Sequence, residues 1–499
     1  LATRVALGAS RGRILKQLLT ESAVLSACGA VGGVLLTLWA RDAIVALSPA
    51  NVPRIDEVRI DAAVLGFALL VATLTMLAIG VMPAVLSSRR ALQQELAGGR
   101  KGVAGGGKQW VRGSLVVAQL ALSLALLTGA GLLARTFWNL ISVDTGFNAE
   151  QVTTMEVLLP RPKYQDAARR ADFVDRVVST LQANPLVQAA GGTTNLPLSN
   201  TNMSFMFYTE GMTPDKDVPY PANLRAVTGG YFAALQIPVL RGRGIGAEDR
   251  FGSPPVVVVN EAMRRKYWPN TDPIGQRISI TRGRTVVWRE IVGIVGNIRH
   301  AGLSEEPAPE IYMPYAHDPF FFVRIAVRST GDPSQLAGAM RAAVWAVDPA
   351  QPVSRVRSMN DVIASSIAAQ RFNTVLIGTF ALLALVLAAV GLYGIVSHSV
   401  TLRFHEFGVR VALGARRQHV LGLVLRQAMV MGTIGVTLGV ALALGVTRLI
   451  ETQLYGTTAR DPLTFAGVAA LLFGVVVLAS LVPARRAISV DPMRALRAE

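Results

Sequence analysis

Long apolar stretches dominate the pattern of hydrophobic and polar positions along this chain. Six of them are nearly free of charge and reach about 20 residues, the length that an α-helix needs to cross a bilayer. They cover residues 22–40, 62–86, 114–134, 374–396, 428–446 and 463–484. Buried helices of a large soluble core would give the same pattern, but six such segments with basic flanks favour a protein with six transmembrane helices.

The basic residues gather between these segments. Residues 1–21, 87–113, 397–426 and 485–499 hold 19 Lys and Arg and five acids, which accounts for +14 of the net charge of +17. These four segments fall on one side of the membrane, and the positive-inside rule assigns that side to the cytoplasm. The other side receives two short loops and one large insert, residues 135–373. Basic charge spread in this way, without a zinc-finger or RNP-like motif, argues against nucleic-acid binding.

The chain contains an internal repeat. Arg4–Ala9 is identical to Arg410–Ala415, an offset of 406, and Gly29 and Gly33 align with Gly435 and Gly439. The offset becomes 400 further on, where Asp61 aligns with Asp461 and Pro83 with Pro483. Both copies have the same orientation, which indicates a parallel duplication. Glycines at i and i+4 let transmembrane helices approach closely, so these four glycines are predicted helix-packing positions.

The segment Arg4–Leu19 is basic and amphipathic. Such a helix can lie at the level of the lipid headgroups. It can equally dock a cytoplasmic partner. The residues alone leave both interpretations open.

The insert is polar enough for an ordinary extracytoplasmic domain, and it mixes short β runs with helical patterns. Helices are expected after Asp166 and after Asp332, where Asp332-Pro333 makes a suitable helix start. The expected strands are 152–159, 204–208, 256–259, 278–280, 286–295 and 321–327. The insert is therefore expected to be α+β, in two subdomains.

Motifs that would carry catalysis are incomplete. Gly102–Gln109 resembles a phosphate-binding loop, but it ends in Gln where Ser or Thr should hold magnesium, and no strand precedes it. Gly8–Gly12 fits a G-x-S-x-G pattern inside an amphipathic helix, not after a strand. The five histidines form no metal-ligand spacing, and the single cysteine, Cys28, permits no intrachain disulfide. We expect neither enzymatic activity, nor a metal, nor a cofactor in this chain.

Many short motifs resemble one known family. Outside the insert these are Arg403, Glu406, Phe407-Gly408, Arg410, Ala412–Ala415, Leu387–Gly394, Asp461-Pro462, Pro483–Ala487 and Asp491–Arg497. Inside it they are Gly229–Phe232, Gly242-Arg243, Val259–Glu261, Asp272–Gly275 and Ile291–Val295. Together they resemble the MacB/FtsX-type ABC transporter permeases, in the duplicated form without a fused ATPase. His405 departs from the basic residue usual before the glutamate.

The resemblance implies an α-helical membrane protein with six transmembrane helices in two parallel repeat halves and an inserted α+β periplasmic core domain of the MacB type. Residues 1–98 would be the first FtsX-like permease copy, truncated at its N-terminus because the chain opens with Leu1 inside a helical pattern. Residues 99–134 would be a basic linker and a transmembrane helix, 135–373 the periplasmic domain, and 374–499 the second copy. The expected location is the bacterial inner membrane.

The resemblance also implies a partner, an ABC ATPase subunit in the cytoplasm that binds ATP. The cytoplasmic helices would couple it to the spans, through Arg4, Gly8, Arg11, Glu406, Gly408, Arg410, Gly414 and Arg417. Membrane lipid surrounds the spans, and a periplasmic partner protein and a dimer both stay open. The leading hypothesis is export or extraction of a lipophilic compound, a peptide or a lipoprotein. The alternatives are a mechanotransmitting sensor or regulator that moves no substrate, and a passive scaffold.

Overall fold

The computed structural model describes residues 11–47, 59–77, 106–199, 201–212, 217–280, 286–331, 335–403, 410 and 416–488. The chain divides into two compact units. Unit 1 comprises Leu1–Phe137 and Ala369–Glu499, and unit 2 comprises Trp138–Ala368. Unit 2 is therefore inserted into unit 1 along the chain.

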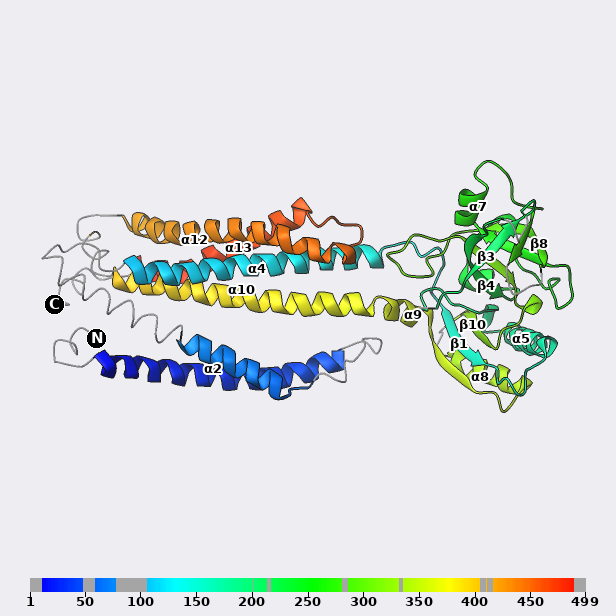
Figure 1. Ribbon diagram of the computed structural model, residues 1–499, viewed down its shortest axis with the longest axis horizontal. Coiled ribbons are helices and arrows are strands. Elements are labelled where there is room, and N and C mark those ends of the chain that lie inside the picture. Colours follow the sequence, from blue (N-terminus) through cyan, green and yellow to red (C-terminus); the bar gives the residue numbers. More distant parts are fainter. Residues whose placement is uncertain are drawn as a thin grey trace. The chain divides into compact units, whose positions relative to one another are not determined.

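Unit 1 is built from long helices in the part of the chain that the structure describes (Figure 1). They are α2 (Arg11–Leu47), α4 (Gly106–Ile141), α10 (Ala368–Leu402), α12 (Arg417–Val446) and α13 (Pro462–Ile488), with the short helix η4 (Thr447–Gln453) after α12. Their apolar parts are long enough to cross a membrane, which agrees with five of the predicted spans. The other expected span is described only as a shorter apolar helix, Ala62–Leu77, because residues 78–105 lie outside the described part. Six spans therefore stay a prediction.

Helix α4 packs closely against α12. A Cβ atom at Gly435 would lie 2.7 Å from the Cβ of Leu120, and one at Gly439 would lie 2.8 Å from the Cβ of Leu124. The Cβ at Gly439 would also lie 3.0 Å from the carbonyl oxygen of Ala121. Distances this short leave no space for a side chain, so these two positions need glycine.

The same helix also contacts α13 and α10. A Cβ at Gly131 of α4 would lie 2.9 Å from the Cγ2 of Thr464 on α13. On the side of α10, the Ser123 hydroxyl donates a hydrogen bond to the carbonyl oxygen of Ala384, at 3.0 Å. Helix α4 is thus held by three neighbours, α10, α12 and α13, which run beside it in Figure 1.

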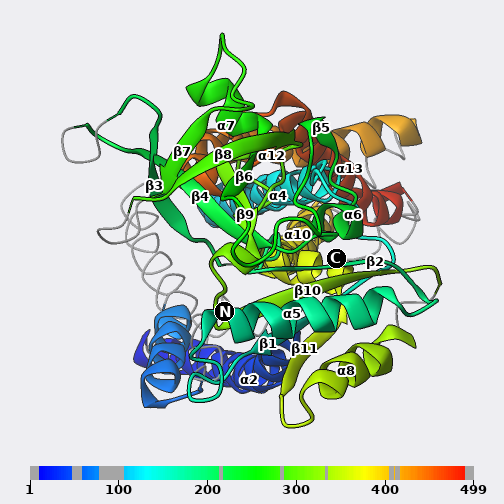
Figure 2. The same ribbon diagram turned by 90° about the vertical axis from the view of Figure 1, so that its right-hand side faces the viewer.

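Unit 2 begins with an open antiparallel sheet. Its strands follow the order β11 (Val353–Ser358), β1 (Val152–Leu158), β10 (Phe322–Ser329) and β2 (Val187–Thr193). Helices α5 (Ala167–Gln182) and α8 (Leu336–Val347) pack on this sheet, and both are in view in Figure 2. Alternate residues of β1 and β10 join the apolar side chains of the helices in one core, as expected for a sheet with one covered face.

The remaining strands form a closed ring. It runs from β4 (Tyr220–Val227) through β3 (Ser204–Thr209), β7 (Arg277–Ile280), β8 (Trp288–Val295), β6 (Val256–Asn260) and β9 (Glu310–Pro314), and β9 pairs with β4 again. Strand β5 (Val239–Gly242) pairs with β8 outside the ring. Closure removes the free edges of these strands. The ring and the open sheet pair at Thr193 and Val227, with main-chain hydrogen bonds from Thr194 to Ala226 and from Thr228 to Gly192 on either side.

Short helices complete unit 2. They are α6 (Tyr231–Leu235), α7 (Glu261–Tyr267), η2 (Tyr315–His317) and α9 (Met359–Ser366). Helix α5 begins as expected, since the carboxylate of Asp166 accepts a hydrogen bond from the amide of Ala168. The expected start of α8 at Asp332-Pro333 lies outside the described residues.

All six predicted strands are present, with ends within two residues of those expected, and the α+β character is confirmed. The sequence analysis overlooked β2, β4, β5, β9 and β11. Strand β2 carries Gly191 because a Cβ there would lie 2.3 Å from the amide nitrogen of Tyr231. In β4 the buried Arg225 interrupts the apolar pattern, and β9 is a strand of five residues that begins at the buried Glu310.

We expect Gly439→Leu to destabilise unit 1, because the new side chain must occupy space already filled by Leu124 and Ala121 of α4. Overpacking of this kind costs about 1–3 kcal/mol. The measurement is the free energy of unfolding of the purified protein in mixed micelles titrated with a denaturing detergent. Gly445→Leu on the same helix is the control, since a Cβ there meets nothing within 4 Å. Equal losses in the two variants would contradict a specific contact between α4 and α12.

Candidate functional site

Polar contacts tie the end of α4 to the start of α13. Asp461 accepts hydrogen bonds from the hydroxyl of Thr464 at 2.5 Å, from the amide of Thr464 at 3.0 Å and from the guanidinium of Arg135 at 2.5 Å. These donors, Thr464 first, hold the pKa of Asp461 below its usual range despite some desolvation. The hydroxyls of Thr136 and Thr457 lie 3.1 Å apart and add a second tie.

Most of the expected ATPase-coupling residues lie outside the described part of the chain. These are Arg4, Gly8, Glu406, Gly408 and Gly414. Arg11 is the first described residue of α2, Arg417 begins α12, and Arg410 has an exposed side chain. Their role in coupling stays a prediction.

Unit 2 contains a cleft of about 480 Å³ between its two subdomains. The cleft is lined by Asp175, Val178, Ser179 and Gln182 of α5 and by residues 227–230, 245–247, 249–250 and 314–316. Helix α5 covers the open sheet, whereas β4 and β9 belong to the ring. The cleft therefore changes shape if the open sheet and the ring move relative to each other.

The turn from β4 to α6 forms one wall of this cleft and rests on β2. Gly230 has φ of +89°, and a Cβ there would lie 2.4 Å from the carbonyl oxygen of Ala190. The side-chain amide of Gln182 on α5 donates to the same carbonyl oxygen, at 2.9 Å. A turn that approaches a strand this closely requires glycine, both for its positive φ and for the contact distance.

Charged side chains surround the cleft. The guanidinium of Arg243 donates to both carboxylate oxygens of Asp249, at 2.7 and 2.9 Å, and the amide of Gly246 donates at 2.9 Å. Burial alone would raise the pKa of Asp249, but these donors outweigh it and lower the pKa. Burial raises the pKa of Asp175 instead, and the neighbouring Asp172 adds to this. The cleft thus presents one clamped carboxylate and one that takes up a proton more readily.

A second polar cluster is fully buried where β4 and β9 pair. The guanidinium of Arg225 lies 3.2 Å from the carboxylate of Glu310, and both side chains are at most 1% exposed. The hydroxyl of Tyr312 donates to the same carboxylate at 2.5 Å, and the ring of His300 lies 3.5 Å from it. Burial raises the pKa of Glu310 against the opposing effect of Arg225, and burial lowers the pKa of His300. Such a pair withstands burial only with hydrogen bonds from its surroundings.

Arg328 of β10 ties together the segments that meet near the entry of the chain into unit 2. Its buried guanidinium donates to the main-chain oxygens of Asn148, Glu150 and Ala234, at 2.8, 2.8 and 3.0 Å. Residues 148 and 150 follow α4, and Ala234 belongs to α6. One side chain thereby fixes the segment after α4 to both β10 and α6.

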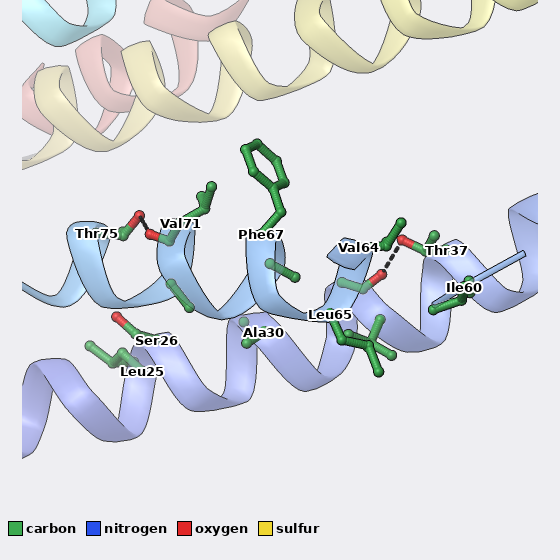
Figure 3. Close-up of a pocket in the computed structure, with 15 residues that line it drawn as sticks. Leu25, Ser26, Ala30, Thr37, Ile60, Val64, Leu65, Phe67, Val71 and Thr75 are labelled. Atoms are coloured by element: carbon green, nitrogen blue, oxygen red, sulfur yellow. Dashed lines mark hydrogen bonds between the residues drawn. The ribbon is translucent and has the colours of Figure 1, made fainter. Parts of the chain in front are cut away.

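Unit 1 contains an apolar groove of about 520 Å³ between α2 and the helix Ala62–Leu77 (Figure 3). Gly29 and Gly33 line it, and a Cβ at either position would meet nothing within 4 Å. The hydroxyls of Thr37 and Thr75 donate to carbonyl oxygens of their own helices. The groove therefore presents a nearly apolar surface. These two glycines make no close helix contact within the described residues, unlike Gly435 and Gly439.

The described residues contain no group of three or more His, Cys, Asp or Glu side chains that could hold a metal ion. The sequence pattern indicated the turn at Gly229-Gly230 and the pair Gly242-Arg243 only through family resemblance. The sequence analysis did not identify Arg225, Glu310 or Arg328 as functional or structural residues. An arginine or glutamate inside a short apolar run is the signal that could have found them, because such residues are buried only with a partner.

We expect Asp249→Asn to loosen the loop 245–250 at neutral pH, because the variant loses the ion pair with Arg243. A charge-assisted hydrogen bond contributes about 1.5–3 kcal/mol, less here because the Arg243 side chain is 40% exposed and solvent screens the pair. The pKa of Asp249 is lowered in the folded protein, so its contribution is present above the unfolded pKa and disappears as the pH falls through the folded value.

Hydrogen–deuterium exchange of residues 243–250, measured between pH 3 and 7, tests this. The difference in protection between wild type and variant should shrink toward low pH. Asp217→Asn, an exposed acid elsewhere in unit 2, is the control. A difference that grows as the pH falls would contradict the assignment.

Two family models match this chain. The model of the FtsX-like permease C-terminal domain matches residues 1–96 and 378–492. The model of the MacB-like periplasmic core domain matches residues 114–343. The second match lies between the two parts of the first, which is the arrangement that the division into two units describes.

Curated relatives are between 25% and 28% identical to this chain over the residues that align. The macrolide export ATP-binding/permease protein MacB of Wolinella succinogenes is 28% identical over 290 residues, which are 56% of this chain and 44% of that protein. The pyoverdine export ATP-binding/permease protein PvdT of Pseudomonas syringae pv. tomato is 25% identical, over 54% of this chain and 41% of that protein. The ABC transporter permease YknZ of Bacillus subtilis is 25% identical, over 56% of this chain and 70% of that protein.

The matched region thus spans less than half the length of the MacB and PvdT relatives. Among solved structures, the periplasmic region of MacB from Actinobacillus actinomycetemcomitans is similar, with 12% identity and a TM-score of 0.31, over 45% of this chain and 95% of that one.

The two family models together account for most of the length of this chain. They identify it as a member of the MacB/FtsX-type ABC transporter permeases.

Proposed function

We propose that this chain is the permease subunit of a transporter in which ATP hydrolysis by a separate ATPase subunit moves the inserted unit 2. The observation that carries this proposal is the insertion of a MacB-like domain between α4 and α10 of an FtsX-like helical unit. Both ends of unit 2 continue into long apolar helices. A shift of α4 relative to α10 would therefore reach unit 2 through its own chain ends.

The membrane part would have six spans in two parallel copies. Its basic segments would lie in the cytoplasm, and unit 2 would lie on the opposite, outer side of the membrane. The ATPase would bind the cytoplasmic helices through the residues around Arg4 and Gly8 in one copy and around Arg410 and Gly414 in the other. ATP would be bound by that partner. These helices are basic, which suits an acidic surface on the ATPase.

The cleft between the open sheet and the ring is the part of unit 2 that such motion would open and close. Relatives are named for export of macrolides and of pyoverdine, which supports export or extraction of a lipophilic compound, a peptide or a lipoprotein. One observation favours the alternative, transmission to a periplasmic partner without transport. The cleft carries Asp175, Gln182 and Arg250, whereas pockets for lipophilic ligands are lined mainly by apolar side chains.

We expect Arg410→Glu to uncouple the ATPase, because the exchange reverses the charge of an exposed side chain at the cytoplasmic end of the predicted coupling helix. Affinity purification of the tagged protein from its native membranes, followed by an ATPase assay, measures the effect. Copurified ATPase activity should fall about tenfold, the loss for one interfacial charge contact. Arg341→Glu on the exposed surface of α8 is the matched control. Equal activity in both variants would count against an ATPase contact at this helix.

We expect the cleft to change width during the ATPase cycle, because α5 and the loop 245–250 belong to different subdomains of unit 2. Nitroxide labels are attached at Ser179→Cys and Ala247→Cys in a Cys28→Ser background. Pulsed electron paramagnetic resonance in lipid nanodiscs then measures the distance between the two labels across the cleft. The distance distribution should differ between the nucleotide-free complex and the vanadate-trapped complex. A label pair within α5, at Asp172→Cys and Ser179→Cys, should not change. Identical distributions across the cleft would exclude it as the moving part.

A further inference from the structure

Arginine side chains gather on the face of the open sheet that is opposite to α5 and α8. Glu156 of β1 belongs to this face, because both of its neighbours in the strand are part of the core. The guanidiniums of Arg324 on β10 and Arg355 on β11 lie 3.1 and 3.5 Å from its carboxylate. Burial lowers the pKa of Arg324, and the charges of Arg355 and Arg357 lower it further against the effect of Glu156. The three arginines therefore form one cluster.

The backbone of β11 is distorted at this cluster. Strand β11 is the last strand of the open sheet and lies beside β1 (Figure 2). The register of the two strands shifts between Thr154 and Glu156, and Arg355 in the resulting bulge has φ of +50°. Basic residues and bulges protect a free sheet edge from pairing with another chain. Edge protection does not require the left-handed conformation that is unfavourable for an arginine, so this bulge indicates a further function for the Arg355 side chain.

The cluster has one positive charge more than the neighbouring acids balance. Its arginines are Arg324, Arg355 and Arg357, and the acids are Glu156 and Asp361, whose carboxylate caps α9. The side chain of Arg355 is 69% exposed. Within the described structure, the guanidinium donors of Arg355 other than Nη1 have no hydrogen-bond partner. A ligand with a single negative charge would complement this arrangement.

Chain continuity connects this cluster to the start of a candidate membrane span. The guanidinium of Arg357 donates to the hydroxyl of Ser365 in the last turn of α9, at 3.4 Å. Three residues later Ala368 begins α10, which is 35 residues long and apolar enough to cross a membrane. A helix of that size is about 52 Å long and exceeds the hydrocarbon core of about 30 Å. The first residues of α10 would therefore lie near the lipid headgroups, where phosphate is the anionic group.

We propose that Arg355 and Arg357 bind the headgroup phosphate of an anionic phospholipid, while Arg324 and Glu156 hold Arg355 in position. The planar guanidinium group matches the oxygens of a phosphate. A phospholipid with one net negative charge balances the excess charge of the cluster, whereas a zwitterionic lipid brings its own cation. The bound lipid would hold the edge of the open sheet at the membrane surface. The proposal depends neither on the ATPase nor on the transported substrate.

The test uses the full chain in phosphatidylcholine nanodiscs that contain a phosphatidylglycerol probe with a diazirine on its headgroup. After irradiation, mass spectrometry of the proteolytic peptides locates the label. We expect labelling of residues 353–358 and of the last turn of α9, about fivefold stronger than with a phosphatidylcholine probe that carries the same diazirine, as expected for one charge at a membrane surface. Equal labelling by the two probes overturns the proposal. Loss of labelling in an excess of inorganic phosphate assigns the site to a free anion and also overturns it.

Arg355→Gly tests the cluster without straining the fold, since glycine readily adopts the positive φ of this position. Labelling by the phosphatidylglycerol probe should fall about fivefold, because one arginine charge is lost. Arg355→Lys keeps the charge and should retain most of the labelling. Arg341→Gln removes an exposed arginine of α8 and is the matched control. Equal labelling of Arg355→Gly and Arg341→Gln overturns the proposal. Because the readout needs no ATP hydrolysis, it stays informative if the proposed ATPase coupling fails.

Discussion

The close approach of α4 to α12 is the constraint on which the rest of unit 1 depends. In lipid, apolar surface alone provides little driving force for helices to associate, so close packing and polar contacts determine which helices pair. Gly435 and Gly439 permit contact at the level of the backbone, and the Arg135–Asp461 pair fixes α4 along the length of α13. The same α4 leads directly into unit 2. The position of α4 among its neighbours therefore defines one of the two points at which the inserted unit is attached.

Unit 2 is held together by charged side chains where its two subdomains meet. The open sheet and the ring pair at Thr193 and Val227, with main-chain hydrogen bonds from Thr194 to Ala226 and from Thr228 to Gly192 on either side. Arg328 of β10 adds a hydrogen bond to Ala234 of α6, and the buried Arg225–Glu310 pair joins β4 to β9 next to this junction. Hydrogen bonds of buried charges are strong but depend on direction, and a displaced buried charge is costly. Apolar packing alone would allow the subdomains to slide, whereas these bonds favour a small number of defined arrangements.

The sequence predicted those features that depend on pattern alone. Spans follow from length and apolar content, and strands such as β6 follow from runs of valine. The sequence analysis did not predict strands β4 and β9, because Arg225 and Glu310 are residue types typical of the surface. Only the pairing of the two strands brings these side chains together in the interior. The cleft could not be predicted, because its walls come from α5, the turn at Gly229-Gly230 and residues 245–250, which are distant in sequence. The coupling residues are predictable only by resemblance, because their chemistry depends on a partner surface.

The two glycine pairs show how far a local pattern determines a contact. Gly29 and Gly33 have the spacing of Gly435 and Gly439, yet only the second pair contacts another helix in the described structure. The spacing removes the obstacle to close approach and leaves the choice of neighbour to other groups. In the second copy that choice is made by the charge of Asp461, which pairs with an arginine from α4. Asp61 occupies the aligned position in the first copy and caps its own helix through the amide of Val64. The repeated aspartate is thus a helix cap in both copies, and in the second copy it also pairs with an arginine of α4.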